Sequence, residues 1–138
     1  MKQTPIELAK TFTIDVDKVN DFIELKFISK DVGQENIDVQ SDLIVKAIMD
    51  VFAKFPDKKN WKVLVDTAST KVHSMSKYSM KNYEKLIGQE YAEKIAILVD
   101  DTDKQAKIAN FVLSILAKVN KKVSVFTSRG EVNMWLNI

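Results

Sequence analysis

The sequence predicts an α/β fold in which helices cover a β-sheet of mixed strand direction. Residues 12–16 and 22–29 alternate apolar and polar side chains, which is the pattern of a half-buried strand. Further along, helical apolar periods alternate with short apolar runs, as is typical of β-α-β units with parallel strands. The run Trp61–Ser69 opens with an almost continuous apolar stretch. A strand of this kind needs cover on both faces, so we expect it at the centre of the sheet.

The composition is that of a single globular domain spanning residues 1–138. The chain has no cysteine and one histidine, which excludes disulfides, thiolate chemistry and histidine-based metal sites. A formal net charge of +2, from 21 basic and 19 acidic residues, does not favour nucleic acid as a partner. No apolar stretch suits a signal peptide or a transmembrane segment, so we expect a cytoplasmic protein.

The first half is expected to contain an antiparallel hairpin, one helix and the central strand. The two alternating stretches are joined by the polar residues 17–21, which favours the hairpin. A loop over residues 30–37 follows. Residues 38–55 then place apolar side chains at i, i+3/i+4 and i+7, the period of an amphipathic helix that Pro56 ends.

The second half is expected to add two parallel strands and three helices, in the overall order β-β-α-β-α-β-α-β-α. Ser76 is the expected N-cap of the second helix. Residues 94–99 form the next strand, and the acidic residues 100–103 suit the start of a third helix. After a last strand at 122–126, Ser128 and Glu131 have the spacing of a capping box for a short final helix. The apolar stripe of the second helix is expected to comprise Met80, Tyr83, Ile87 and Tyr91.

Four stretches resemble the small SpoIIAA-like proteins of the STAS/SEC14 type. They are WKVLVD, KIAILVDD, KKVSVF and the closing EVNMWL, and the likeness covers roughly residues 8–138. The closing pattern is the most specific: a strand ending in Phe126, then Glu131 with a small residue, then Trp135-Leu136, although Val132 stands where the small residue is usual. The resemblance implies a STAS-like fold, and much of that family has no settled activity.

The resemblance also implies a candidate phosphorylation site. Anti-sigma-factor antagonists of this type carry a phosphorylated serine, in an Asp-Ser-Ser/Thr-Gly signature, at the start of the helix after the central strand. Residues 73–77 read His-Ser-Met-Ser-Lys, without the aspartate and the glycine, and Ser76 is the nearest match. The residues alone give another interpretation, in which Ser76 only caps the helix. Because aspartate also caps well, Ser76→Asp is expected to leave stability nearly unchanged.

A ligand or partner-binding loop is expected after the central strand. Between Thr67 and Ser79 the sequence gathers six hydroxyl residues and its histidine, at the carboxyl end of a parallel strand, where α/β folds bind ligands. The alternative is that hydroxyl side chains are common in turns and caps because they bond to nearby backbone. The candidate residues are Asp66, Thr67, Ser69, His73, Ser74, Ser76, Lys77 and Tyr78.

Catalytic and metal sites are less favoured. Asp66, Asp100 and Asp101 follow strands and could hold Mg²⁺, but the last two more simply start a helix, so no metal or cofactor is predicted. A Ser76-His73-Asp66 triad lacks the Gly-x-Ser-x-Gly elbow that would present the serine, so no enzyme is expected.

The function expected from sequence is a non-enzymatic binding or regulatory module that acts through protein contacts. One alternative is a SEC14-like carrier or sensor of a small lipophilic molecule, with Tyr78, Tyr83 and Tyr91 lining a cleft. The other is a small enzyme with an acidic pocket at the strand ends. Another protein is the expected partner, and a homodimer stays open. Lys77, Lys81 and Lys85 recur every four residues and could meet an acidic partner or form a solvated face.

Overall fold

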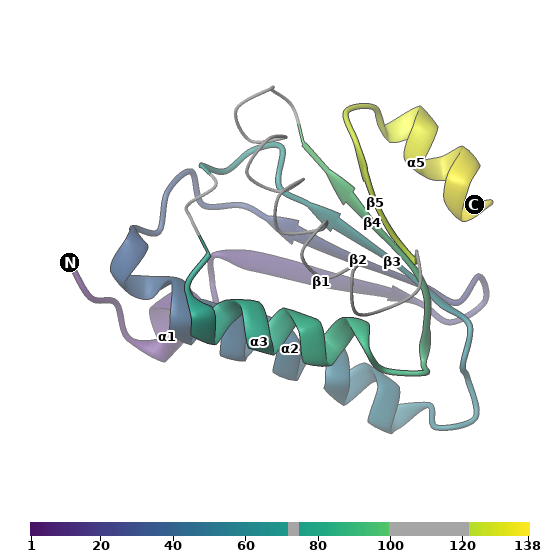
Figure 1. The fold of residues 1–138 in the computed structure, drawn as a ribbon, viewed down its shortest axis with the longest axis horizontal. Helices are drawn as coiled ribbons and strands as arrows, with labels where there is room; N and C mark the ends of the chain where they lie inside the picture. The colour runs from purple at the N-terminus through teal and green to yellow at the C-terminus, as the bar shows by residue number, and fades with distance from the viewer. Residues whose placement is uncertain (72–74, 100–121) are drawn as a thin grey trace.

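Five strands form one sheet in the computed structural model, which describes residues 1–71, 75–99 and 122–138 (Figure 1). β1 and β2 pair antiparallel, whereas β2, β3, β4 and β5 run parallel to their neighbours. The predicted α/β class, with an N-terminal hairpin and later parallel strands, is therefore confirmed. Across the sheet the order is β1 (Phe12–Asp17), β2 (Phe22–Phe27), β3 (Trp61–Asp66), β4 (Ala92–Leu98) and β5 (Val123–Phe126).

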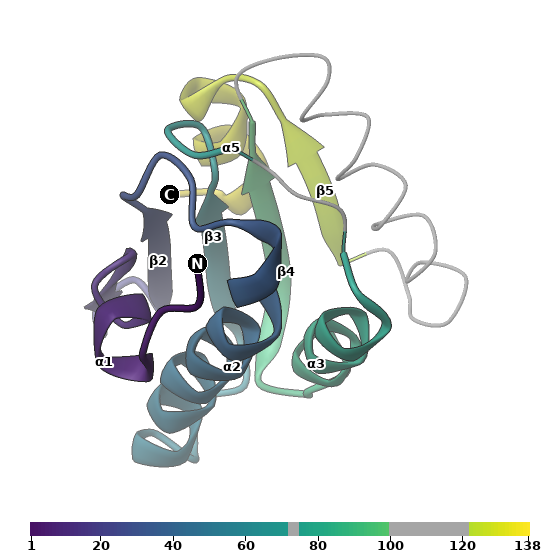
Figure 2. The ribbon, with the colours of Figure 1, turned by 90° about the vertical axis from the view of Figure 1, so that its left-hand side faces the viewer.

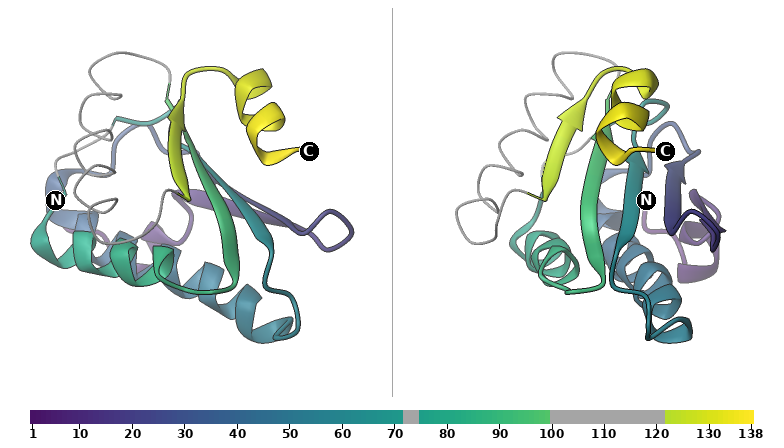
Figure 3. Two further views of the ribbon diagram at one scale, coloured as in Figure 1. Left: turned by 45° about the vertical axis from the view of Figure 1, so that its right-hand side comes forward. Right: turned by 90° about the vertical axis from the view of Figure 1, so that its right-hand side faces the viewer.

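Helices cover both faces of this sheet. Figure 2 shows α2 and α3 side by side on one face, and Figure 3 shows α5 on the opposite face. The third predicted helix, which residues 100–103 would open, lies outside the described residues. Those described are α1 (Pro5–Leu8), a 3-10 turn (Gln34–Asn36), α2 (Ile37–Lys54), α3 (Lys77–Ile87) and α5 (Arg129–Leu136).

The short helix α1 was not predicted from sequence, although its signals are present. Thr4 and Glu7 form a reciprocal capping box, and Pro5 occupies the first turn, where its missing N–H costs nothing. A single turn is too short to show an apolar period, which explains why the pattern search passes over it.

Two details of the second helix differ from the prediction. Tyr91 lies beyond the end of α3, in the turn before β4, and its ring stacks on Phe52 of α2 with centroids 5.4 Å apart. The hydrophobic stripe of α3 ends at Leu86 and Ile87, because the helix stops at Gly88. By contrast, the N-cap at Ser76 is confirmed.

The larger core lies between the sheet and the helix pair α2–α3. It is built from apolar side chains that alternate along the strands and repeat along the helices, as the sequence periods predict. Its buried members are Ile23, Leu25, Ile44, Ile48, Phe52, Trp61, Val63, Leu86, Ile87, Ala92, Ile95, Ile97, Val99 and Val123.

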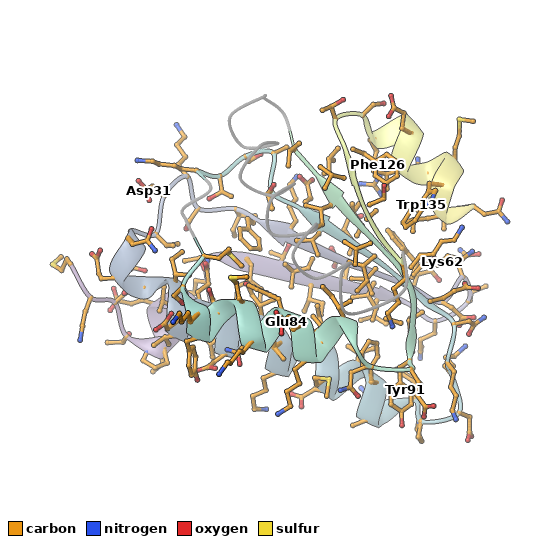
Figure 4. All side chains as sticks on the ribbon, in the orientation of Figure 1. Asp31, Lys62, Glu84, Tyr91, Phe126 and Trp135 are labelled. Carbon is orange, nitrogen blue, oxygen red and sulfur yellow. The ribbon has the colours of Figure 1, made fainter. Side chains whose placement is uncertain are left out.

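A smaller core lies under α5. Leu64 points to this face, away from its neighbour Val63, and packs in one cluster with Leu136 of α5. Trp135 covers the edge of the cluster, 5.4 Å from the ring of Phe126, and Figure 4 shows the two side chains together below α5. Lys94 lies 5.0 Å from the centroid of Trp135 and donates to its carbonyl at 2.8 Å. The central strand is thus covered on both faces, as predicted.

The described helices contain no candidate membrane span. None of those helices combines the length and the apolar character that crossing a bilayer requires.

Candidate functional site

The described part of the predicted loop begins where β3 ends, and its polar side chains bond to nearby backbone. Asp66 is 8% exposed, and its carboxylate accepts from the N–H of Ala68 at 3.0 Å. The hydroxyl of Thr67 donates to the carbonyl of Leu98 at 2.9 Å, which joins the ends of β3 and β4. The hydroxyl of Thr70 donates to the carbonyl of Lys30 at 3.3 Å. These contacts match the structural interpretation of hydroxyl-rich loops.

Two of the predicted loop residues and two of the predicted acidic residues are not placed. His73 and Ser74 lie outside the described residues, as do Asp100 and Asp101. The Ser-His-Asp and Mg²⁺ hypotheses therefore stay untested. Among the residues that the structure does describe, no group of three or more His, Cys, Asp or Glu side chains could hold a metal ion.

Ser76 is tied to its own helix and also to α2. Its hydroxyl oxygen accepts from the N–H of Ser79 at 3.0 Å, while the N–H of Ser76 donates to the Ser79 hydroxyl at 3.0 Å. This reciprocal cap gives partners to two backbone N–H groups at the start of α3, which stabilises the helix. The Ser76 hydroxyl also makes a short hydrogen bond to the Asp38 carboxylate of α2. A phosphate on Ser76 would therefore meet a carboxylate that already sits at this helix start.

A second set of hydrogen bonds joins α2 to α3 further along. The Tyr78 hydroxyl donates to the Asp42 carboxylate, at 2.7 and 2.8 Å from its two oxygens. The Asn82 amide donates to the same carboxylate at 2.8 Å and to the Ser41 hydroxyl at 2.9 Å. The bond to Asp42 raises the pKa of Tyr78, because it favours the protonated phenol. We call this set the α2–α3 seam; it comprises Asp38, Ser41, Asp42, Ser76, Tyr78 and Asn82.

Sequence reasoning found one side of the seam and missed the other. Ser76 and Tyr78 were candidates, whereas the α2 residues and Asn82 were not. A signal was present, since residues 38, 41 and 42 repeat at i, i+3 and i+4, and residues 78 and 82 at i and i+4. Each set lies on one helix face. What the pattern could not show is that the two faces meet.

The three tyrosines proposed to line a cleft have separate surroundings. Tyr78 is 49% exposed and bonded to Asp42, and Tyr91 stacks on Phe52. Tyr83 packs against the larger core. Burial raises the pKa of the Tyr83 phenol, because the charged form would lose its hydration.

This pKa predicts a loss of stability in alkali. Above pH about 10 an unfolded tyrosine releases its proton, whereas folded Tyr83 keeps it, so the folded state binds more protons and stability falls as pH rises. Tyr83→Phe removes this group. We expect urea unfolding to show a shallower alkaline decrease in Tyr83→Phe than in the wild type. An equally steep decrease in both proteins would contradict the prediction.

Comparison with protein-family models, with curated proteins and with solved structures gives no match for this chain.

Proposed function

We propose that this chain is a non-enzymatic binding or regulatory module of the SpoIIAA-like type, which acts through protein contacts. The observation that carries the proposal is a contrast at the strand ends: the polar side chains of the loop bond to backbone, whereas two at the start of α3 are exposed to solvent. The side chains of Asp66, Thr67 and Thr70 hold neighbouring backbone in place. The side of α3 beside this loop, in contrast, presents Lys77 and half of Tyr78 to solvent.

The arrangement of elements supports the finer assignment to a STAS-like fold. A hairpin is followed by α2, β3, α3 and β4 in the order that the resemblance implies. The chain closes with β5 and α5, which carry the Phe and Trp-Leu pattern, and Phe126 and Trp135 contact each other. Such a domain would present the loop and the start of the helix after the central strand to a partner.

Site-specific photo-cross-linking tests this proposal. A photoreactive phenylalanine derivative would replace Ser69 or Lys77, two exposed residues at the carboxyl edge of the sheet and the start of α3. The control position is Asp57, which is exposed and precedes β3 at the other edge. In an extract of the cell that encodes the chain, we expect positions 69 and 77 to label one protein, or a second copy of the chain. Excess unlabelled chain should compete with this labelling, and position 57 should not give it.

Two results would contradict the proposal. One is labelling that is equal at all three positions and that unlabelled chain does not reduce. The other is a small molecule that native mass spectrometry finds retained by the purified chain, together with no specific cross-link. The second result would favour the carrier hypothesis.

A further inference from the structure

We propose that a row of three lysines on α3 binds an acidic segment of a partner protein. The row comprises Lys77, Lys81 and Lys85, and the inference rests on the proposed function because it names the chemistry of the partner. All three side chains are exposed. At 1.5 Å rise per residue, positions four apart lie about 6 Å apart along one face of a helix.

The three lysines of the row, unlike several other lysines on the surface, make no polar side-chain contact with the described residues. Within the described residues, no hydrogen bond, ion pair or ring contact involves these three side chains. Elsewhere lysines do have such contacts: Lys59 pairs with Glu90 at 3.3 Å, and Lys58 pairs with Asp21 at 2.5 Å.

The row is also only partly balanced within α3, whose one acidic residue, Glu84, lies three residues beyond Lys81. Like charges four residues apart destabilise a helix, and the row contains two such pairs. Lys77 lies in the first turn, which has no acidic residue and where a positive charge opposes the helix dipole. The carboxylate of Asp38 on α2, which accepts a hydrogen bond from Ser76, brings negative charge to the start of α3. Lys81 and Lys85 lie one and two turns further on, so this charge is more distant from them. A row of partner carboxylates would relieve this repulsion.

The α2–α3 seam keeps the row in place for binding. Hydrogen bonds from Ser76, Tyr78 and Asn82 fix α3 against α2, and Leu86 and Ile87 anchor its far end in the core. The helix therefore does not need to be ordered when a partner binds, which lowers the entropic cost of association.

A short acidic protein segment fits the row better than a membrane or a nucleic acid. A membrane-bound helix inserts its apolar face, whereas the apolar residues Leu86 and Ile87 of α3 lie in the core. A nucleic acid strand would continue past three charges, and the formal net charge of +2 gives it little further attraction. An acidic segment needs carboxylates only about 6 Å apart, as at i and i+4 of a helix or at alternate residues of a strand. The half-exposed ring of Tyr78 adds an aromatic contact that is common in protein interfaces.

The test uses a fluorescent polyglutamate peptide as the probe and fluorescence anisotropy as the measurement. One variant combines Lys77→Gln, Lys81→Gln and Lys85→Gln. The matched control combines Lys10→Gln, Lys54→Gln and Lys59→Gln, three exposed lysines outside α3 and the loop before it, so that both variants lose the same charge. We expect the row variant to bind the peptide about tenfold more weakly than the wild type, as the loss of three exposed ion pairs implies. The control should bind within about twofold of the wild type.

Equal weakening in both variants would overturn the inference, since net charge alone would then explain binding. So would tighter binding of oligothymidine or of phosphatidylserine vesicles than of polyglutamate, with the same dependence on the row. The role of the lysine row and the proposed binding function can also be tested independently of each other. A partner identified by cross-linking that binds the row variant as tightly as the wild type would overturn the role of the lysines and leave the binding module intact.

Discussion

Leu64→Ala is expected to lower the free energy of unfolding by about 2–5 kcal/mol, the usual cost of removing a buried leucine side chain. Leu64 is 0% exposed and lies on the face of β3 that α5 covers. Its cluster is small, so few neighbours are available to fill the space that the substitution leaves. The measurement is chemical denaturation of the wild type and the variant under the same conditions.

Lys26→Ala is the matched control on the neighbouring strand. Lys26 is exposed on β2, and an exposed substitution of this kind changes stability by less than about 0.5 kcal/mol. Similar, mild losses in the two variants would contradict the central, doubly covered position of β3. A large loss in Leu64→Ala alone agrees with it.

Ser76→Asp is expected to lower stability by about 1 kcal/mol, the scale of one lost hydrogen bond together with a new like-charge contact. Sequence alone gave a different expectation, that aspartate would cap the helix as serine does and leave stability nearly unchanged. The contact between Ser76 and Asp38 changes this expectation, because the new carboxylate would face an existing one. Thermal or chemical unfolding at neutral pH measures the difference.

A second substitution distinguishes repulsion from a poor cap. In the background of Asp38→Asn the facing charge is absent, so Ser76→Asp should then have little effect. Stability loss that is the same in both backgrounds would show that Asp38 is not the cause.

The same reasoning applies to phosphorylation of Ser76. The added negative charge would repel the Asp38 carboxylate and weaken the α2–α3 seam at the start of α3.

The α/β class, the hairpin and the central strand could be read from the sequence because local patterns determine them. Alternation along residues 12–16 and 22–29 places one strand face inward, and Pro56 ends the preceding helix close to the predicted position. Ser76 could be predicted as a cap for the same reason, since its partner Ser79 lies three residues away. Such contacts depend on neighbours in the chain.

The surroundings of the candidate site depend on the tertiary structure. Asp38 lies 38 residues from Ser76, and Asp42 lies 36 residues from Tyr78, so no local period connects them. Packing of α2 and α3 on the same face of the sheet brings these side chains together. The sequence by itself therefore determined most of the described helices and strands and where α3 begins. Only the packing of those helices decided that the start of α3 faces two carboxylates, because a polar contact between elements needs both surfaces to be placed.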